Sequence, residues 1–112
     1  MRYLLLFWTD PSRESPERSA AFGRRVEAWD QQMTDQGVLV LGQSLAEVEE
    51  ARSVQVRNGE ILLTDGPFAE SKEQIGGFSI IDAASMEEAL QVAASIPLAE
   101  VGTVEVRQFQ ER

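Results

Sequence analysis

The chain has 112 residues, of which 43% are hydrophobic and 26% are charged, and it contains neither cysteine nor histidine. This length predicts one compact domain over residues 1–112, and no apolar window approaches the roughly 18 residues of a membrane span. The missing side chains exclude disulfides, thiolate catalysis and imidazole acid–base chemistry. A net charge of −9 would repel nucleic acid and anionic membrane surfaces. We therefore expect a cytoplasmic protein that binds neither.

The first half of the chain predicts a strand followed by a long helix. Residues 2–8 are apolar at both alternating sets of positions, which is typical of a strand covered on both faces. After the break at residues 9–12, Ser15 is the expected N-cap of a helix with Pro16 at its first position and Gly37 just beyond its end. One buried stripe is predicted along this helix, formed by Phe22, Val26, Trp29 and Met33.

The rest of the chain predicts five strands and a second helix that ends before Pro97. Asn58-Gly59 closes a hairpin, because both central residues of a type I′ turn need positive φ. The pair Gly76-Gly77 indicates a β-bulge or a close backbone approach. A capping box that begins at Ser85 opens the second helix. The strands are expected at residues 38–45, 53–57, 60–64, 75–82 and 103–109.

This order of elements predicts an α+β, ferredoxin-like fold, which is a split βαβ unit with an added β-hairpin. Two helices would cover one face of a mainly antiparallel sheet, so the other apolar face of the first strand would be left open. A soluble monomer rarely exposes an apolar surface of that size. We therefore expect a homodimer in which two copies pack sheet against sheet.

Ionisable side chains gather on the loop between the hairpin and the next strand, where binding groups are often mounted. Asp65 has two interpretations. Its carboxylate could bond backbone N–H groups in a turn, or it could act as a base in a pocket, with its pKa set by burial and by nearby Lys72 or Arg107. In the last strand, Glu105 and Arg107 would face the space between the sheets if the intervening valines pack on the helices. That pair is either a structural ion pair or the floor of a polar pocket.

These residues define the predicted site. Asp65 is the catalytic candidate, and no cofactor is expected. The loop carboxylates match no metal-binding loop, so we expect no metal either. The loop charges, including Glu73, are otherwise a solvated face. The ligand-binding candidates are Arg107, Glu105, Lys72, Glu70 and Phe68.

The segment TDGPFAESKEQIGGF at residues 64–78, together with residues 104–107, closely resembles the DGPF-motif proteins of the YCII-related domain family. The resemblance covers essentially the whole chain. It implies a dimeric α+β barrel of ferredoxin-like protomers from a bacterium. Related domains carry a histidine and aspartate pair, and some are linked to ring-lactone dehalogenation. Asp65 corresponds to that aspartate, whereas the histidine has no counterpart here. Members also occur beside or fused to extracytoplasmic-function sigma factors, which implies a regulatory setting.

Three hypotheses follow. In the first, a pocket between the sheets of the dimer binds a small anionic metabolite through Arg107, and Asp65 moves a proton in lyase- or isomerase-like chemistry. In the second, the same pocket belongs to a non-catalytic sensor, because the sequence shows no nucleophile beside a strong base. In the third, the chain is an interaction module whose acidic surface meets a basic sigma factor.

Overall fold

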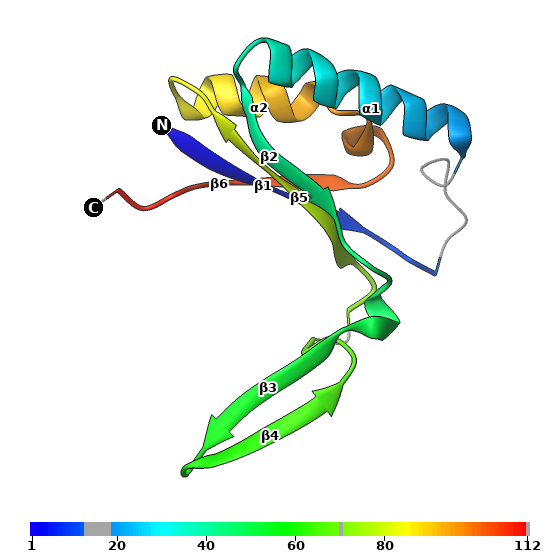
Figure 1. Ribbon diagram of the computed structural model, residues 1–112, viewed down its shortest axis with the longest axis vertical. Coiled ribbons are helices and arrows are strands. Elements are labelled where there is room, and N and C mark those ends of the chain that lie inside the picture. Colours follow the sequence, from blue (N-terminus) through cyan, green and yellow to red (C-terminus); the bar gives the residue numbers. More distant parts are fainter. Residues whose placement is uncertain (13–18, 70, 112) are drawn as a thin grey trace.

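The computed structural model describes residues 1–12, 19–69 and 71–111, and it shows an α+β fold with two α-helices. The main sheet has the strand order β2-β5-β1-β6, and its neighbouring strands are all antiparallel. Both helices lie on the same side of this sheet (Figure 1). The elements are β1 (Arg2–Thr9), α1 (Ala20–Asp35), β2 (Leu39–Ser44), the 3-10 helix η2 (Val48–Glu50), β3 (Arg52–Arg57), β4 (Glu60–Asp65), β5 (Gln74–Asp82), α2 (Met86–Ser95), the 3-10 helix η3 (Pro97–Glu100) and β6 (Thr103–Gln108).

The predicted α+β architecture is confirmed. Strands β1, β2, β5 and β6 with α1 and α2 have the connectivity of a split βαβ unit, and β3 and β4 are the added hairpin. The strand bounds differ from the predicted ones by at most one residue at either end. No helix in the described part of the chain is long and apolar enough to cross a membrane.

The core lies between the sheet and the two helices. On β1, every second side chain points into it: Tyr3, Leu5 and Phe7 are buried. The alternate side chains of β1 reach the opposite face of the sheet, which neither α1 nor α2 covers, and they are only half-buried. We call that surface the open face. From β1 and the residues paired with it, the open face includes Leu4, Leu6, Trp8, Phe78, Ile80, Glu105 and Arg107.

The ends of α1 are fixed by two different caps. At the start, the Ser19 hydroxyl accepts a hydrogen bond from the backbone N–H of Phe22 at 3.0 Å, so the described helix begins later than predicted. The predicted cap at Ser15 and Pro16 lies outside the described residues. At the end, Gly37 has φ +73° and its N–H donates to the Thr34 carbonyl, while the next N–H donates to the Met33 carbonyl. The predicted role of Gly37 is confirmed.

The two glycines at the start of β5 perform separate tasks. Phe7 pairs with Gly77 and Trp8 pairs with Ile75, so Gly76 is the extra residue of a bulge. A Cβ atom on Gly77 would lie 2.9 Å from the carbonyl oxygen of Gln43 on the neighbouring strand β2. Both the bulge and the close backbone approach that the sequence predicted are therefore present.

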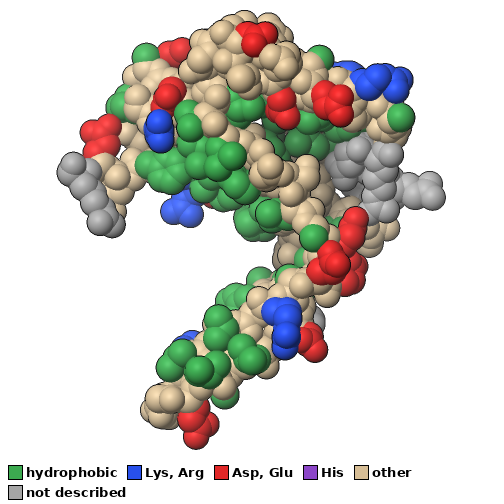
Figure 2. Space-filling model, viewed as in Figure 1, with side chains coloured by type: hydrophobic (Ala, Val, Ile, Leu, Met, Phe, Trp, Pro, Cys, Tyr) green, Lys and Arg blue, Asp and Glu red, His purple; other side chains and the backbone are tan. Residues whose placement is uncertain are grey.

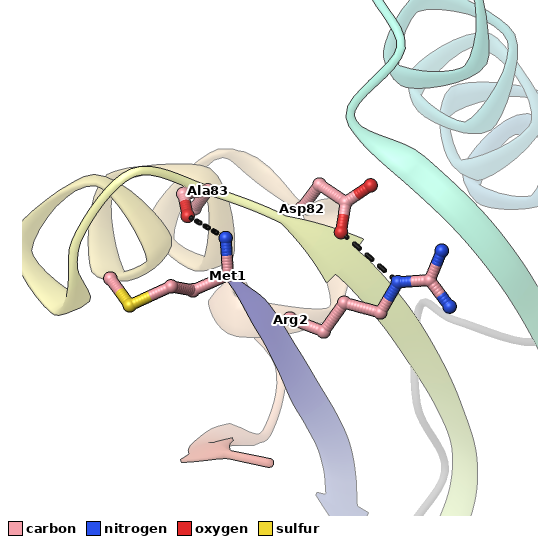
Figure 3. A network of polar contacts seen from close by, with 4 residues as sticks. All are labelled: Met1, Arg2, Asp82 and Ala83. Atoms are coloured by element: carbon pink, nitrogen blue, oxygen red, sulfur yellow. Dashed lines mark hydrogen bonds and ion pairs between the residues drawn. The ribbon is translucent and has the colours of Figure 1, made fainter. Parts of the chain in front are cut away.

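Strands β1 and β5 are also joined at the end of the sheet where the chain begins (Figure 3). The terminal amino group of Met1 donates to the Ala83 carbonyl at 3.1 Å. Arg2 Nε lies 3.2 Å from an Asp82 carboxylate oxygen in an exposed ion pair. Such a pair contributes little to stability, but the hydrogen bond holds the first residue beside the end of β5.

The hairpin β3–β4 forms a separate two-stranded sheet, which we call the arm (residues 52–65). Its turn residues Asn58 and Gly59 have φ values of +52° and +78°, which confirms the predicted turn. The arm extends away from the body and leaves a wide gap below the open face (Figure 1). The radius of gyration is 15.9 Å, compared with about 13 Å for a compact domain of this length.

Candidate functional site

Asp65 lies at the end of β4, where the arm joins the body. Its carboxylate pairs with Arg52 Nε at 3.1 Å, whereas the sequence pointed to Lys72 or Arg107. The Asp65 side chain is 88% exposed. The next residue, Gly66, has φ +92°, and its N–H donates to the Ala51 carbonyl at 2.6 Å. In the protomer, Asp65 therefore ties the two strands of the arm together at their base.

The charged pair of β6 lies on the open face, as predicted, because Val104 and Val106 pack against the core. Glu105 is half-buried and accepts a hydrogen bond from the Trp8 indole Nε1 at 2.9 Å. Arg107 is exposed, and the described residues show no ion pair between it and Glu105. The structural ion pair that the sequence left open is thus not formed. The partner of Glu105 is an indole.

The loop after the arm borders one cleft, which we call the loop cleft. The loop cleft has a volume of about 430 Å³ and lies between residues 45–51 and residues 67–75, with Trp8 on its wall. Phe68, one of the ligand-binding candidates, lines it and is 78% exposed. Lys72 is exposed and is not among the lining residues, and Glu70 lies outside the described residues.

Another cleft, of about 410 Å³, lies between α1 and the sheet, and we call it the helix cleft. Phe7, Val26 and Leu98 form apolar walls. An adjoining hollow of about 330 Å³ shares these three walls. The polar groups in the helix cleft are the hydroxyls of Thr9 and Ser44 and the carboxyl groups of Glu27 and Asp30.

Asp30 is the residue of this cleft whose carboxyl group has a shifted pKa. Burial raises the pKa of the Asp30 carboxyl above its ordinary value of 3.8, and the negative charge of Glu27 raises the pKa further. In the described part of the chain, no lysine or arginine lines the cleft to oppose these two effects. A carboxyl group that holds its proton more tightly, at the wall of a cleft, is suited to give and take protons.

The sequence contains a signal for Asp30 that the buried stripe predicted for this helix leaves out. The predicted stripe includes Val26 but not Asp30. Asp30 follows Val26 by four residues and precedes Met33 by three, so it lies along the edge of that stripe. The structure confirms burial of Phe22, Trp29 and Met33, but Val26 is half-buried and lines the helix cleft.

Two other features of the described residues concern acidic groups. No cluster of three or more aspartate and glutamate side chains is placed to hold a metal ion in that part of the chain. Asp10, at the end of β1, is buried, and its carboxylate accepts hydrogen bonds from the Ser12 N–H at 3.0 Å and the Ser12 hydroxyl at 2.6 Å. These contacts are typical of a carboxylate that stabilises a turn.

Comparisons with known proteins agree with this fold. The sequence model of the YCII-related domain matches residues 1–111. An uncharacterised protein of Rhizobium meliloti (strain 1021) is 35% identical over 112 residues, which cover 96% of this chain and 90% of the relative. Among solved structures, 5-chloro-2-hydroxyhydroquinone dehydrochlorinase (TftG) from Burkholderia phenoliruptrix AC1100, in complex with 2,5-dihydroxybenzoquinone, has a TM-score of 0.59 and 14% identity. The match covers 100% of this chain and 96% of that one, and at this identity it supports the fold alone.

Proposed function

This chain belongs to the YCII-related domain family, and we propose that it binds a small ring compound in the helix cleft and transfers a proton through Asp30. We also propose that it belongs to the DGPF-motif group of the family, a proposal supported by the Asp-Gly-Pro-Phe motif at residues 65–68. The observation that carries the proposal is the position of Asp30. Its carboxyl group has a raised pKa and lines a cleft of about 410 Å³. General acid–base catalysis needs a titratable group within reach of the substrate, with a pKa moved toward the working pH.

The walls of the cleft indicate the class of ligand. Phe7, Val26 and Leu98 offer apolar contacts, and the hydroxyls of Thr9 and Ser44 can hold ring oxygen atoms. Among the residues that the structure describes, two carboxyl groups and no basic residue line the cleft, so a neutral compound is favoured over the anionic metabolite expected from the sequence. The name of the structural neighbour, a dehydrochlorinase of a hydroxylated ring, is in keeping with this class.

The reaction that suits these groups is elimination of hydrogen chloride or a related proton shift. The Asp30 carboxylate accepts a proton from a ring hydroxyl or ring carbon, and the electron pair of the broken bond moves into the ring as the carbon–chlorine bond breaks. Chloride leaves, and Asp30 passes its proton to water. The atoms and charges balance without an oxidant or a reductant.

The test uses 5-chloro-2-hydroxyhydroquinone as the probe, under anaerobic conditions. We expect the parent protein to bind it and release chloride, and Asp30→Asn to bind it while chloride release falls by roughly 10²–10⁴-fold. Val26→Trp, which fills the cleft, should abolish binding. If the parent protein bound the probe without releasing chloride, the sensor hypothesis would be favoured. If Val26→Trp left binding unchanged, the ligand site would not be the helix cleft.

The pocket between two sheets remains a second, separate proposal. It is favoured by the position of Glu105 and Arg107 on the open face, where a second copy would enclose them. In that pocket Arg107 would bind an anionic group and Asp65 would transfer the proton. Arg107→Ala and Asp65→Asn should then weaken binding of a benzoate or phosphate probe, while Asp30→Asn should not. The association with a sigma factor remains a prediction from the family resemblance.

A further inference from the structure

Ser79 is a polar residue on the apolar side of the main sheet. The protein leaves aliphatic side chains of the arm exposed, among them Val54, Ile61 and Leu63, and Figure 2 shows hydrophobic side chains along the arm. Ser79, by contrast, is only 3% exposed. It lies on β5 opposite the fully buried Leu5 of β1, so its side chain is on the side of the sheet that faces the helices. The core side of the sheet therefore carries a hydroxyl where an aliphatic side chain is usual.

The Ser79 hydroxyl makes no hydrogen bond to any of the residues that the structure describes. The Ser95 hydroxyl, by comparison, accepts from the Trp29 indole at 2.8 Å and donates to the Val92 carbonyl at 2.6 Å. Buried polar groups are nearly always bonded, because a buried hydroxyl without a partner has lost its contacts with water and gained nothing in return. The Ser79 hydroxyl is therefore available to a molecule that reaches it.

The adjoining hollow of about 330 Å³ gives access to this hydroxyl, because Ser79 lines it. Gly42 lies opposite Ser79 on β2, and a Cβ atom on Gly42 would lie 3.0 Å from the Ser79 hydroxyl oxygen. The missing side chain of Gly42 thus leaves space beside the hydroxyl. Asp30 lines both the hollow and the helix cleft. One molecule that extends from the cleft into the hollow can therefore contact the Asp30 carboxyl group and the Ser79 hydroxyl together.

We infer that the hollow is a subsite of the ring-binding site and that the Ser79 hydroxyl selects rings with a second oxygen substituent. The inference rests on the proposed function, because it takes Asp30 as the partner of the first substituent. Phe7, Val26 and Leu98 line both spaces and would contact the ring. A serine hydroxyl can donate and accept, so the second substituent is a hydroxyl or a carbonyl oxygen. The ligand class is a ring with two oxygen substituents, in its phenol or its quinone form.

The selection has a physical basis in the burial of Ser79. A ring that fills the hollow displaces water from the hydroxyl, and a ring oxygen at that position replaces the lost hydrogen bond. A ring without that oxygen leaves the hydroxyl buried and unpaired. Sites built to bond a polar group of the ligand reject analogues that lack it for this reason. Ser79 should therefore affect the choice between ligands more than the stability of the fold.

Two probes that differ by one hydroxyl test this inference. Chlorohydroquinone has two hydroxyls, whereas 2-chlorophenol has one, which Asp30 alone can bond. By isothermal titration calorimetry under anaerobic conditions, we expect Ser79→Ala to raise the Kd of chlorohydroquinone by about tenfold and that of 2-chlorophenol by less than about threefold. Gly42→Ala, which places a methyl group beside the Ser79 hydroxyl oxygen, should weaken chlorohydroquinone binding in the same selective way.

Each other outcome would overturn the inference. If Ser79→Ala changed the Kd of both probes equally or of neither, Ser79 would not select the ligand, and the proposed function would still stand on Asp30. Unchanged binding in Gly42→Ala would mean that no ligand uses the space beside the hydroxyl. A parent protein that bound neither probe would remove the subsite, and if it also failed to bind 5-chloro-2-hydroxyhydroquinone, the proposed function would fail too. Urea unfolding should give Ser79→Ala the midpoint of the parent, because the hydroxyl has no partner among the described residues.

Discussion

Asp30 and Asp65 are carboxylates with opposite surroundings, and this contrast explains what the sequence could and could not predict at the scale of single residues. Asp65 follows a strand and precedes Gly-Pro, which marks it as a turn residue, but its ion pair with Arg52 depends on the register of the hairpin. The altered pKa of Asp30 depends on the packing of α1 against the sheet. Sequence periodicity shows only that Asp30 lies at the edge of the buried stripe of this helix.

The raised pKa of Asp30 predicts how stability depends on pH. The native state binds this proton more tightly than the unfolded state, whose pKa stays near 3.8, so the free energy of unfolding falls as the pH rises from that value through the native pKa. The side chain at position 30 of the Asp30→Asn variant cannot ionise, so the free energy of unfolding of this variant does not fall for that reason. Urea unfolding should show the variant to be more stable than the parent at about pH 7, with the difference shrinking toward about pH 3. A difference that grows on acidification would contradict the account.

Gly77 and Gly76 give a matched pair of substitutions. Gly77→Ala would drive a Cβ atom to 2.9 Å from the Gln43 carbonyl, and we expect a loss of about 1–3 kcal/mol in the free energy of unfolding. Gly76→Ala would meet only the Thr9 hydroxyl oxygen at 3.7 Å and should change stability by less than about 0.5 kcal/mol. Chemical denaturation measures both. Equal losses would show that the close approach of β2 to β5 has no energetic role.

At the scale of elements, the predictions that rested on local chemistry were the most accurate. The Asn58-Gly59 turn and the Gly37 cap each follow from a positive φ, a backbone geometry that few residues adopt. The start of α1 was harder to predict, because both Ser15 and Ser19 are suitable caps by residue type. Only the hydrogen bond to the Phe22 N–H identifies Ser19 as the cap of the described helix.

Substitution of that cap tests the helix boundary. Ser19→Ala removes the side chain that accepts from the Phe22 N–H, so we expect stability to fall by about 1 kcal/mol. Ser19→Asp retains an acceptor and places a negative charge at the helix N-terminus, so it should restore the stability. Thermal unfolding at constant pH distinguishes the two variants. If Ser19→Ala were neutral, the described cap would contribute nothing.

At the scale of the whole molecule, the sequence predicts an uncovered sheet face but not the direction of the arm. Alternation along β1 leaves Leu4, Leu6 and Trp8 without helix cover, and the structure places them on the open face. The hairpin pattern defines the strands and the turn of the arm. The orientation of the arm relative to the sheet depends on the residues that join it to β2 and β5. The hydrophobic periodicity of the sequence does not predict this orientation.

Small-angle X-ray scattering of the parent protein tests most directly whether a second copy covers the open face, as the sequence predicts. One measurement gives both mass and radius of gyration. We expect a mass of about twice the 12.4 kDa of one chain at micromolar concentration and a radius of gyration above the 15.9 Å of the protomer. A mass of 12.4 kDa that persists as the concentration rises would contradict the account.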